Sequence, residues 1–330
     1  MKKEELKKLE NQIKENKFSN SYLFYGMEKF LINKYVDEIT KALNLVDDVM
    51  NYVVIDGESA SVGEIVDAFV TVPFFVEKRL VIVKNSKLFC KGHSNGEDFV
   101  EGIKLLPDST VLIFVEDKVE KNLKTYKAIS KVAYVMAFDK ADDNYLIDYV
   151  IENLTSKEIK IDKSVAAYFI QTVNSDIKKL NIELNKLENY IEDKEITKKD
   201  IDTICTKTVE FKVFSLVEDM AYKNTAKALD TYKNLIESKE SPLMILTLIS
   251  RQMRILLEVK VLSNNPKNNI SEKIGIPSFT VKNYVKQTEN FSGKELYNNL
   301  IKCLETDVAI KVGKFTGVDG VLKLIIDIST

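Results

Sequence analysis

Histidine and cysteine are scarce in this chain of 330 residues. His93 is the single histidine, and the three cysteines, Cys90, Cys205 and Cys303, form no Cys-x-x-Cys pair. A catalytic or metal site built on two histidines is therefore excluded, and an odd, scattered set of cysteines argues against a disulfide framework. We interpret His93, in the loop-like segment from Lys91 to Gly96, as incidental rather than catalytic. These absences predict a protein of the reducing cytoplasm without a metal centre.

A long uninterrupted apolar run is also missing. The first segment, Met1 to Phe18, carries charges throughout and has no apolar core of the kind found in signal peptides. The most apolar stretch, Pro242 to Leu262, is broken by Arg251, Gln252 and Arg254. It therefore predicts an amphipathic helix rather than a membrane span, and we expect no membrane insertion.

Charge of one sign does not dominate, because 48 basic residues face 50 acidic ones and leave a net charge of −2. The chain as a whole is therefore not attracted to nucleic acid, and any DNA contact must be local. Arginine, the better bidentate ligand for phosphate, occurs at only three positions, Arg79, Arg251 and Arg254. Arg251 and Arg254 share a helix face and could bind phosphate or an acidic partner. An ordinary solvated stripe is the favoured interpretation.

The chain exceeds the size at which single cores stop growing, so we expect two or three domains. In residues 1–140, short apolar runs bounded by polar residues alternate with helical patterns, which predicts a parallel sheet covered on both faces. The expected strands are Tyr22–Tyr25, Tyr52–Ile55, Leu80–Val83, Val111–Val115 and Val135–Phe138, and the expected helices start near Lys29, Val62, Asp98 and Leu123.

The strand signal fades from Asn144 onward, and a small helical domain is expected over residues 141–207. Ile161–Val173 and Ile177–Ile191 have apolar residues at helical spacing. Thr197 with Asp200 three positions later is typical of a helix start.

Residues 208–330 are expected to form an all-helical domain, interrupted by a loop over Ser263–Ile276. The helical patterns there are Phe211–Tyr222, Ala226–Ile236, Leu243–Leu262, Val281–Thr288, Lys294–Ala309 and Val318–Ile328.

Gly26 follows the first expected strand, where a phosphate-binding loop would lie. Such a loop needs GxxxxGK[ST], but the second glycine and the Ser/Thr are missing here, and Glu28 would repel phosphate. We interpret Gly26 as a tight strand-to-helix turn, the degenerate remnant of a nucleotide loop. Glu116 and Asp117 resemble the acidic end of a Walker B strand but are interpreted as a solvated edge. The residues give no case for an enzyme or a bound cofactor.

The most informative local feature is Val72-Pro73-Phe74-Phe75, between an amphipathic helix and the third strand. Pro73 disfavours a helical conformation at Val72 and should end the helix. Neighbouring side chains in an extended segment point to opposite sides, so at least one phenylalanine is a candidate for exposure. An exposed aromatic there would suit a partner's pocket. Packing of both rings under the connection is an equally open interpretation on these residues alone.

Ordered fragments along nearly the whole chain resemble the delta-subunit family of the bacterial DNA polymerase III clamp loader. Each fragment is weak alone, and their order and spacing carry the resemblance. They are Tyr22-Leu23-Phe24-Tyr25-Gly26, Phe30-Leu31-Ile32, Val72-Pro73-Phe74-Phe75, Lys78-Arg79-Leu80-Val81-Ile82-Val83-Lys84, Ile182-Glu183-Leu184-Asn185-Lys186-Leu187, Phe214-Ser215-Leu216-Val217, Ser241-Pro242-Leu243, Arg251-Gln252-Met253-Arg254 and Asp307-Val308-Ala309-Ile310-Lys311-Val312-Gly313.

The resemblance implies an AAA+ (RecA-like) domain, a small helical lid and a C-terminal helical collar. It implies a part of the DNA polymerase III holoenzyme without ATPase activity of its own, which binds the beta sliding clamp and opens its ring for loading onto primed DNA. Phe74 and Phe75 would form the clamp-binding wedge, shaped by Val72 and Pro73. The implied partners are the clamp, the delta prime and tau or gamma subunits, and primer-template DNA.

Three other readings compete with this one. An AAA+ ATPase with an atypical nucleotide site would bind ATP through Lys29. The related delta prime subunit typically carries a Ser-Arg-Cys motif and a zinc-binding cysteine cluster, and this chain has neither. A generic helical adaptor would not depend on Phe74 and Phe75 for clamp binding.

Overall fold

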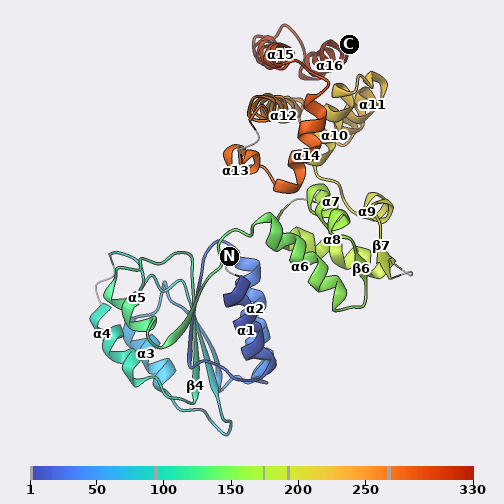
Figure 1. Cartoon of the computed structure of the whole chain (residues 1–330). Helices are drawn as coiled ribbons and strands as arrows, with labels where there is room; N and C mark the ends of the chain where they lie inside the picture. Colours follow the sequence, from blue (N-terminus) through green and yellow to red (C-terminus); the bar gives the residue numbers. More distant parts are fainter. Residues whose placement is uncertain (1–2, 93–95, 174, 192–193, 266–268) are drawn as a thin grey trace. The chain divides into compact units, whose positions relative to one another are not determined.

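A computed structural model of the chain describes residues 3–92, 96–173, 175–191, 194–265 and 269–330. It divides into two compact units (Figure 1). The first ends at Tyr145, and the second runs from Leu146 to Thr330. His93 lies outside the described residues, so its interpretation as incidental stays a prediction. Within the described ranges, no helix is long and apolar enough to cross a bilayer.

The first unit is built on a five-stranded parallel sheet in the order β2-β3-β4-β1-β5. The predicted parallel α/β architecture is confirmed, and each strand lies within a residue or two of its predicted position. The strands are β1 (Ser21–Tyr25), β2 (Tyr52–Asp56), β3 (Arg79–Lys84), β4 (Thr110–Glu116) and β5 (Ala133–Ala137).

Helices cover both faces of this sheet because the central strands are apolar on both sides. In Figure 1, α1 and α2 lie on one face, and α3, α4 and α5 lie on the other. The second face packs Leu23, Val81 and Phe114 against Phe69 and Phe99. The helices are α1 (Lys3–Lys14), α2 (Lys29–Ala42), α3 (Val62–Val70), α4 (Gly96–Gly102) and α5 (Lys124–Ile129), with a short 3₁₀ turn, η1, at Ile103–Leu105.

Helix α1 occupies the segment that looked like a charged leader. Leu6 and Leu9 are buried, and three tyrosine hydroxyls of the sheet and α2 donate hydrogen bonds to the helix. Their acceptors are Gln12 Oε1 for Tyr22 (3.0 Å), Glu10 Oε1 for Tyr35 (2.8 Å) and Glu5 O for Tyr134. The charged segment is therefore a helix that packs on the sheet. It is held largely by hydrogen bonds, which a hydropathy pattern does not reveal.

The second unit is helical apart from a two-residue strand pair, β6 (Lys160–Ile161) and β7 (Glu195–Ile196), which the sequence reading missed. Short α13 also lies inside the segment predicted as a loop. The elements are α6 (Asp143–Thr155), which begins in the first unit, α7 (Lys163–Val173), α8 (Ile177–Tyr190), α9 (Lys198–Ile204), α10 (Val209–Ala221), α11 (Thr225–Glu237), α12 (Pro242–Leu262), α13 (Ile270–Ile274), the 3₁₀ turn η2 (Ser278–Thr280), α14 (Val281–Thr288), α15 (Gly293–Lys311) and α16 (Gly317–Ser329).

Two local signals explain where helices begin and end in this unit. The predicted cap of α9 is present, because the Thr197 N–H donates to the Asp200 carboxylate at 2.8 Å and the Thr197 hydroxyl donates at 2.6 Å. Asn269 accepts from the Glu272 N–H and starts α13, and Gly275, at φ 73°, ends it. The predicted loop-like interruption over Ser263–Ile276 therefore contains one short helix, α13, because a cap on each side stabilises an extra helical turn.

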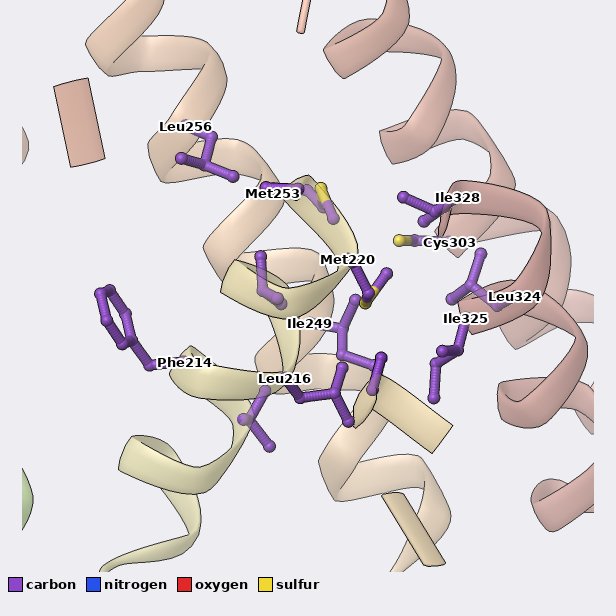
Figure 2. Packing of buried hydrophobic residues seen from close by; sticks show 14 of the residues in the cluster. Phe214, Leu216, Met220, Ile249, Met253, Leu256, Cys303, Leu324, Ile325 and Ile328 are labelled. Carbon is purple, nitrogen blue, oxygen red and sulfur yellow. The ribbon is translucent and has the colours of Figure 1, made fainter. Parts of the chain in front are cut away.

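The core of the second unit is formed by side chains from α10, α12, α15 and α16, which point toward one another in Figure 2. Met220, Ile249, Met253, Cys303 and Ile325 lie at the centre and are almost fully buried. The Thr208 N–H at the start of α10 donates to Thr172 O at 3.1 Å, so the predicted lid and collar meet within this one unit. The division of the chain at residues 140 and 207 stays a prediction.

Candidate functional site

The predicted site residues of the first unit lie at opposite edges of the sheet. All five strands are parallel, so the chain leaves each strand at one edge, the carboxyl edge, and enters the next at the other, the amino edge. At the carboxyl edge, Gly26 follows β1 and Glu116 is the last residue of β4. Phe74 and Phe75 precede β3 at the amino edge.

At the amino edge, α3 ends at Val70, shortly before Pro73 as predicted, and the capping residue Thr71 is extended. The segment Val72–Phe75, called here the 72–75 turn, then carries its apolar side chains on the surface. Val72 is 69% exposed, Phe74 54% and Phe75 91%. The two rings touch edge to face, with centroids 4.2 Å apart. The interpretation in which both rings pack under the connection was therefore wrong, and both are available to a partner.

The turn is held by a residue that the sequence reading missed, Asn51. This side chain, only 1% exposed, donates from Nδ2 to Phe74 O at 2.9 Å and accepts from the Phe74 N–H at 2.6 Å. Asp48 in turn accepts from the Asn51 N–H and Nδ2 at 2.9 and 2.8 Å. The Asp-x-x-Asn spacing just before β2 was the available signal, but only the fold brings it beside Phe74.

At the carboxyl edge, two backbone N–H groups of the strand-to-helix turn at Gly26 are hydrogen-bonded within the chain. The Gly26 N–H donates to Glu116 O at 3.2 Å, and the Glu28 N–H donates to Phe138 O at 3.0 Å. Gly26 has φ 128°, and a Cβ there would lie 2.4 Å from Phe138 O. The prediction of a tight turn at Gly26 fits this geometry, since glycine is required by both the backbone angle and the close approach.

The charged groups around this turn are also partnered. Lys29 lies close to where the lysine of a phosphate-binding loop would be. It forms an ion pair with Asp117, and its Nζ lies 3.4 Å from Glu116 O. Glu28 accepts from the Ala141 N–H at 3.3 Å. Two backbone N–H groups and the nearby charged side chains of this turn are thus bonded within the chain.

Glu116 is not the solvated edge residue that we predicted. It is 2% exposed, and its carboxylate accepts from the Ser86 N–H (2.9 Å), the Ser86 hydroxyl and the Lys87 N–H (3.3 Å). Burial raises the pKa of the Glu116 carboxyl, and the hydrogen bonds from Ser86 and Lys87 oppose that rise. The prediction failed because the connection after β3 folds over Glu116. Asp117 is largely exposed, as predicted.

In the second unit, Arg251 and Arg254 both lie exposed on α12. Arg254 pairs loosely with Glu258 at 3.8 Å, one turn along the helix, as expected for a solvated stripe. Arg251 borders a recess of about 270 Å³ that is also lined by Phe214, Gln252 and Tyr284. The described residues contain no group of three or more side chains able to hold a metal ion.

The fold is that of a known clamp-loader subunit. The structure titled Bacillus subtilis DNA clamp loader delta protein superposes with a TM-score of 0.65, at 23% identity, over 98% of this chain and 99% of that one. Residues 22–139 match the family model of the DNA polymerase III delta subunit, and residues 210–327 match the model of its C-terminal domain. The chain therefore belongs to the DNA polymerase III delta subunit family, a component of the clamp loader.

Two curated relatives agree with this assignment. The DNA polymerase III subunit delta of Bacillus subtilis is 26% identical over 308 residues, which cover 89% of this chain and 88% of the relative. The probable DNA polymerase III subunit delta of Aquifex aeolicus is 22% identical over 297 residues, which cover 86% and 83%.

Proposed function

We propose that this delta subunit binds the beta sliding clamp through the 72–75 turn and helps to open its ring for loading onto primed DNA. The observation that carries the proposal is the exposure of Phe74 and Phe75 on a turn whose backbone is fixed by Asn51. Large aromatic side chains on a rigid surface are the residues that most often anchor a protein interface. Val72 and Pro73 complete the proposed wedge.

Ring opening would follow from a preference for one conformation of the clamp. A ligand shifts a conformational equilibrium only through its different affinities for the two states. The wedge would supply the affinity, and contacts around it would favour the open ring. The subunit would do this without hydrolysing ATP itself, and the closed hydrogen bonding of Gly26 and Glu28 at the carboxyl edge supports that view.

Within the loader, we propose that residues 208–330 form the collar contact with the delta prime and tau or gamma subunits. Helix α15 supports this role with a stripe of exposed apolar side chains at spacings of three and four, along one helix face. Its members are Tyr297, Ile301, Leu304, Val308 and Val312. Primer-template DNA would be met inside the assembled loader, and the free thiols Cys90, Cys205 and Cys303 fit a cytoplasmic protein.

The proposal is tested by measuring binding of the purified chain to the clamp of the same organism without ATP. Phe74→Ala combined with Phe75→Ala should weaken binding by tens to several hundredfold, because removing a central aromatic anchor costs on the order of 2 to 4 kcal/mol. Circular dichroism should be unchanged, since neither ring belongs to the buried core.

The matched control is Met27→Ala, which shortens an equally exposed apolar side chain at the carboxyl edge. It should bind the clamp as the wild type does. Undiminished binding by the folded Phe74→Ala, Phe75→Ala protein would place the contact elsewhere and favour a generic adaptor.

A further inference from the structure

The side-chain amide of Asn51 forms three hydrogen bonds at the amino edge. One Nδ2 hydrogen goes to Phe74 O, the other goes to the Asp48 carboxylate, and Oδ1 receives the Phe74 N–H. An amide has two donors on nitrogen and an acceptor oxygen. Here the oxygen and one donor pair with Phe74, and the second donor pairs with Asp48. The side chain thus pairs with Phe74 as a neighbouring strand would.

Asp48 fixes the direction in which this amide points. Its Oδ1 accepts from the Met50 and Asn51 N–H groups at 3.0 and 2.9 Å, and its Oδ2 accepts from Asn51 Nδ2 at 2.8 Å. These hydrogen bonds, that of the Asn51 side chain first, lower the pKa of Asp48, so the carboxylate is ionised at neutral pH. With Nδ2 held by Asp48, Oδ1 can only face the Phe74 N–H.

The turn has little else to hold its backbone. Between Thr71 and Lys78, the described part of the chain gives the backbone no hydrogen bonds other than the pair to Asn51. Phe75 has φ 58°, a left-handed conformation that costs a residue with a side chain roughly 1 kcal/mol or more. Exposed apolar side chains would not by themselves keep such a segment in one conformation.

We infer that Asn51, oriented by Asp48, is a positioning residue that holds the 72–75 turn in the conformation in which it meets the clamp. The inference rests on the proposed clamp-binding function. A segment that is already ordered before binding avoids the loss of conformational entropy that a flexible one suffers at the interface. Asn51 itself is buried and need not touch the clamp.

The first measurement needs no partner. Hydrogen–deuterium exchange of the Phe74 amide in the free protein should be slow in the wild type and fast in Asn51→Ala, since its acceptor is lost. Asn20→Ala is the matched control, because Asn20 also donates to an aspartate, Asp108, at the same edge without bonding to the turn. It should leave the Phe74 exchange rate unchanged.

The second measurement is a double-mutant cycle on clamp affinity. Asn51→Ala should weaken binding about three- to tenfold, the cost of ordering one or two segments at an interface. In a Phe74→Ala, Phe75→Ala background the same change should have almost no further effect, because there is no aromatic anchor left to position. A merely structural role would lower the folded fraction equally in both backgrounds.

The outcomes separate the two proposals. Wild-type affinity in folded Asn51→Ala, together with lost binding in Phe74→Ala, Phe75→Ala, would overturn the positioning role and leave the clamp-binding function standing. Wild-type affinity in Phe74→Ala, Phe75→Ala would overturn the function itself. If Asn51→Ala does not fold, Asp48→Ala decides the matter: weaker clamp binding with faster Phe74 exchange supports the inference, and unchanged values refute it.

Discussion

The two edges of one parallel sheet differ in what they offer to other molecules. At the carboxyl edge, the backbone around Gly26 and the Glu116 carboxylate are bonded within the chain. At the amino edge, the polar groups of Asn51 and Asp48 are also bonded internally, but they are used to display two aromatic rings. Internal hydrogen bonding occupies polar groups in one place and presents a surface in the other.

Backbone conformation shows the same contrast. Gly26 has a positive φ because the chain passes close to Phe138 and leaves no room for a side chain. Phe75 also has a positive φ, but its surroundings are open and its ring faces solvent. An unusual angle at glycine is explained by packing. An unusual angle at an exposed phenylalanine calls for a function, and the proposed clamp binding would supply one.

At the amino edge, the largest expected effect is the loss of clamp binding in Phe74→Ala with Phe75→Ala. At the carboxyl edge the largest effect should be on stability instead. Gly26→Ala would force a Cβ to within 2.4 Å of Phe138 O, and we expect it to lower the free energy of unfolding by roughly 2 to 4 kcal/mol. Urea denaturation would measure the loss.

Gly63→Ala is the control for that experiment, because a Cβ at Gly63 in α3 would lie 3.9 Å from Ser61 Oγ, an ordinary contact distance. It should be neutral or slightly stabilising, since alanine favours helix more than glycine does. Equal stability of Gly26→Ala and the wild type would mean that the carboxyl edge is open enough to admit a ligand, and the contrast between the edges would fail.

A smaller effect is expected at Glu116. Its pKa is raised in the folded state, so its contribution to stability is complete below the ordinary value of 4.5 and declines as the pH rises through the raised pKa. Glu116→Gln should remove this decline and lower the free energy of unfolding at pH 7 by roughly 1 to 3 kcal/mol, because the glutamine NH2 group cannot accept from the Lys87 N–H. Denaturation at a series of pH values from 4 to 8 would show the difference. Parallel pH profiles for the two proteins would contradict it.

The smallest effect should come from Lys29, whose ion pair with Asp117 is partly exposed. Lys29→Ala should change stability by less than about 1 kcal/mol and leave clamp affinity unchanged. Magnesium and ATP should raise the melting temperature of neither the wild type nor the variant. A nucleotide-dependent rise in the wild type that disappears in Lys29→Ala would restore the reading as an ATPase with an atypical site.

Regular elements could be predicted from the sequence where hydropathy alone determines them. The buried strands, such as Val111–Val115, and the caps at Thr197 and Asp200 carry their own signals. Helix α1 was missed because it contacts the sheet mainly through hydrogen bonds from tyrosine hydroxyls and through only a few leucines. The burial of Glu116 and the role of Asn51 were missed for a related reason: each bonds to backbone about 23 to 30 residues away in sequence, which no local pattern reveals.

The exposure of Phe74 and Phe75 could be predicted only in part. The proline and the adjacent aromatics located the turn, but they could not decide whether the rings face inward or outward. That depends on whether neighbouring elements leave a space beneath the turn. The Asn51 side chain fills the position next to the Phe74 backbone, and the rings are left on the surface.

The strand order also sets the sequence of events during synthesis. Strand β1 is made first, yet its neighbours in the sheet are the last two strands, with Ser21 opposite both Leu112 and Ala133. The apolar β1 segment must therefore emerge from the ribosome unpaired and wait until β4, which begins at Thr110, has been made. Pairing between such distant segments is slow, and the exposed strand is open to association with other chains until it occurs. Early capture of β1 by a chaperone would protect the nascent chain.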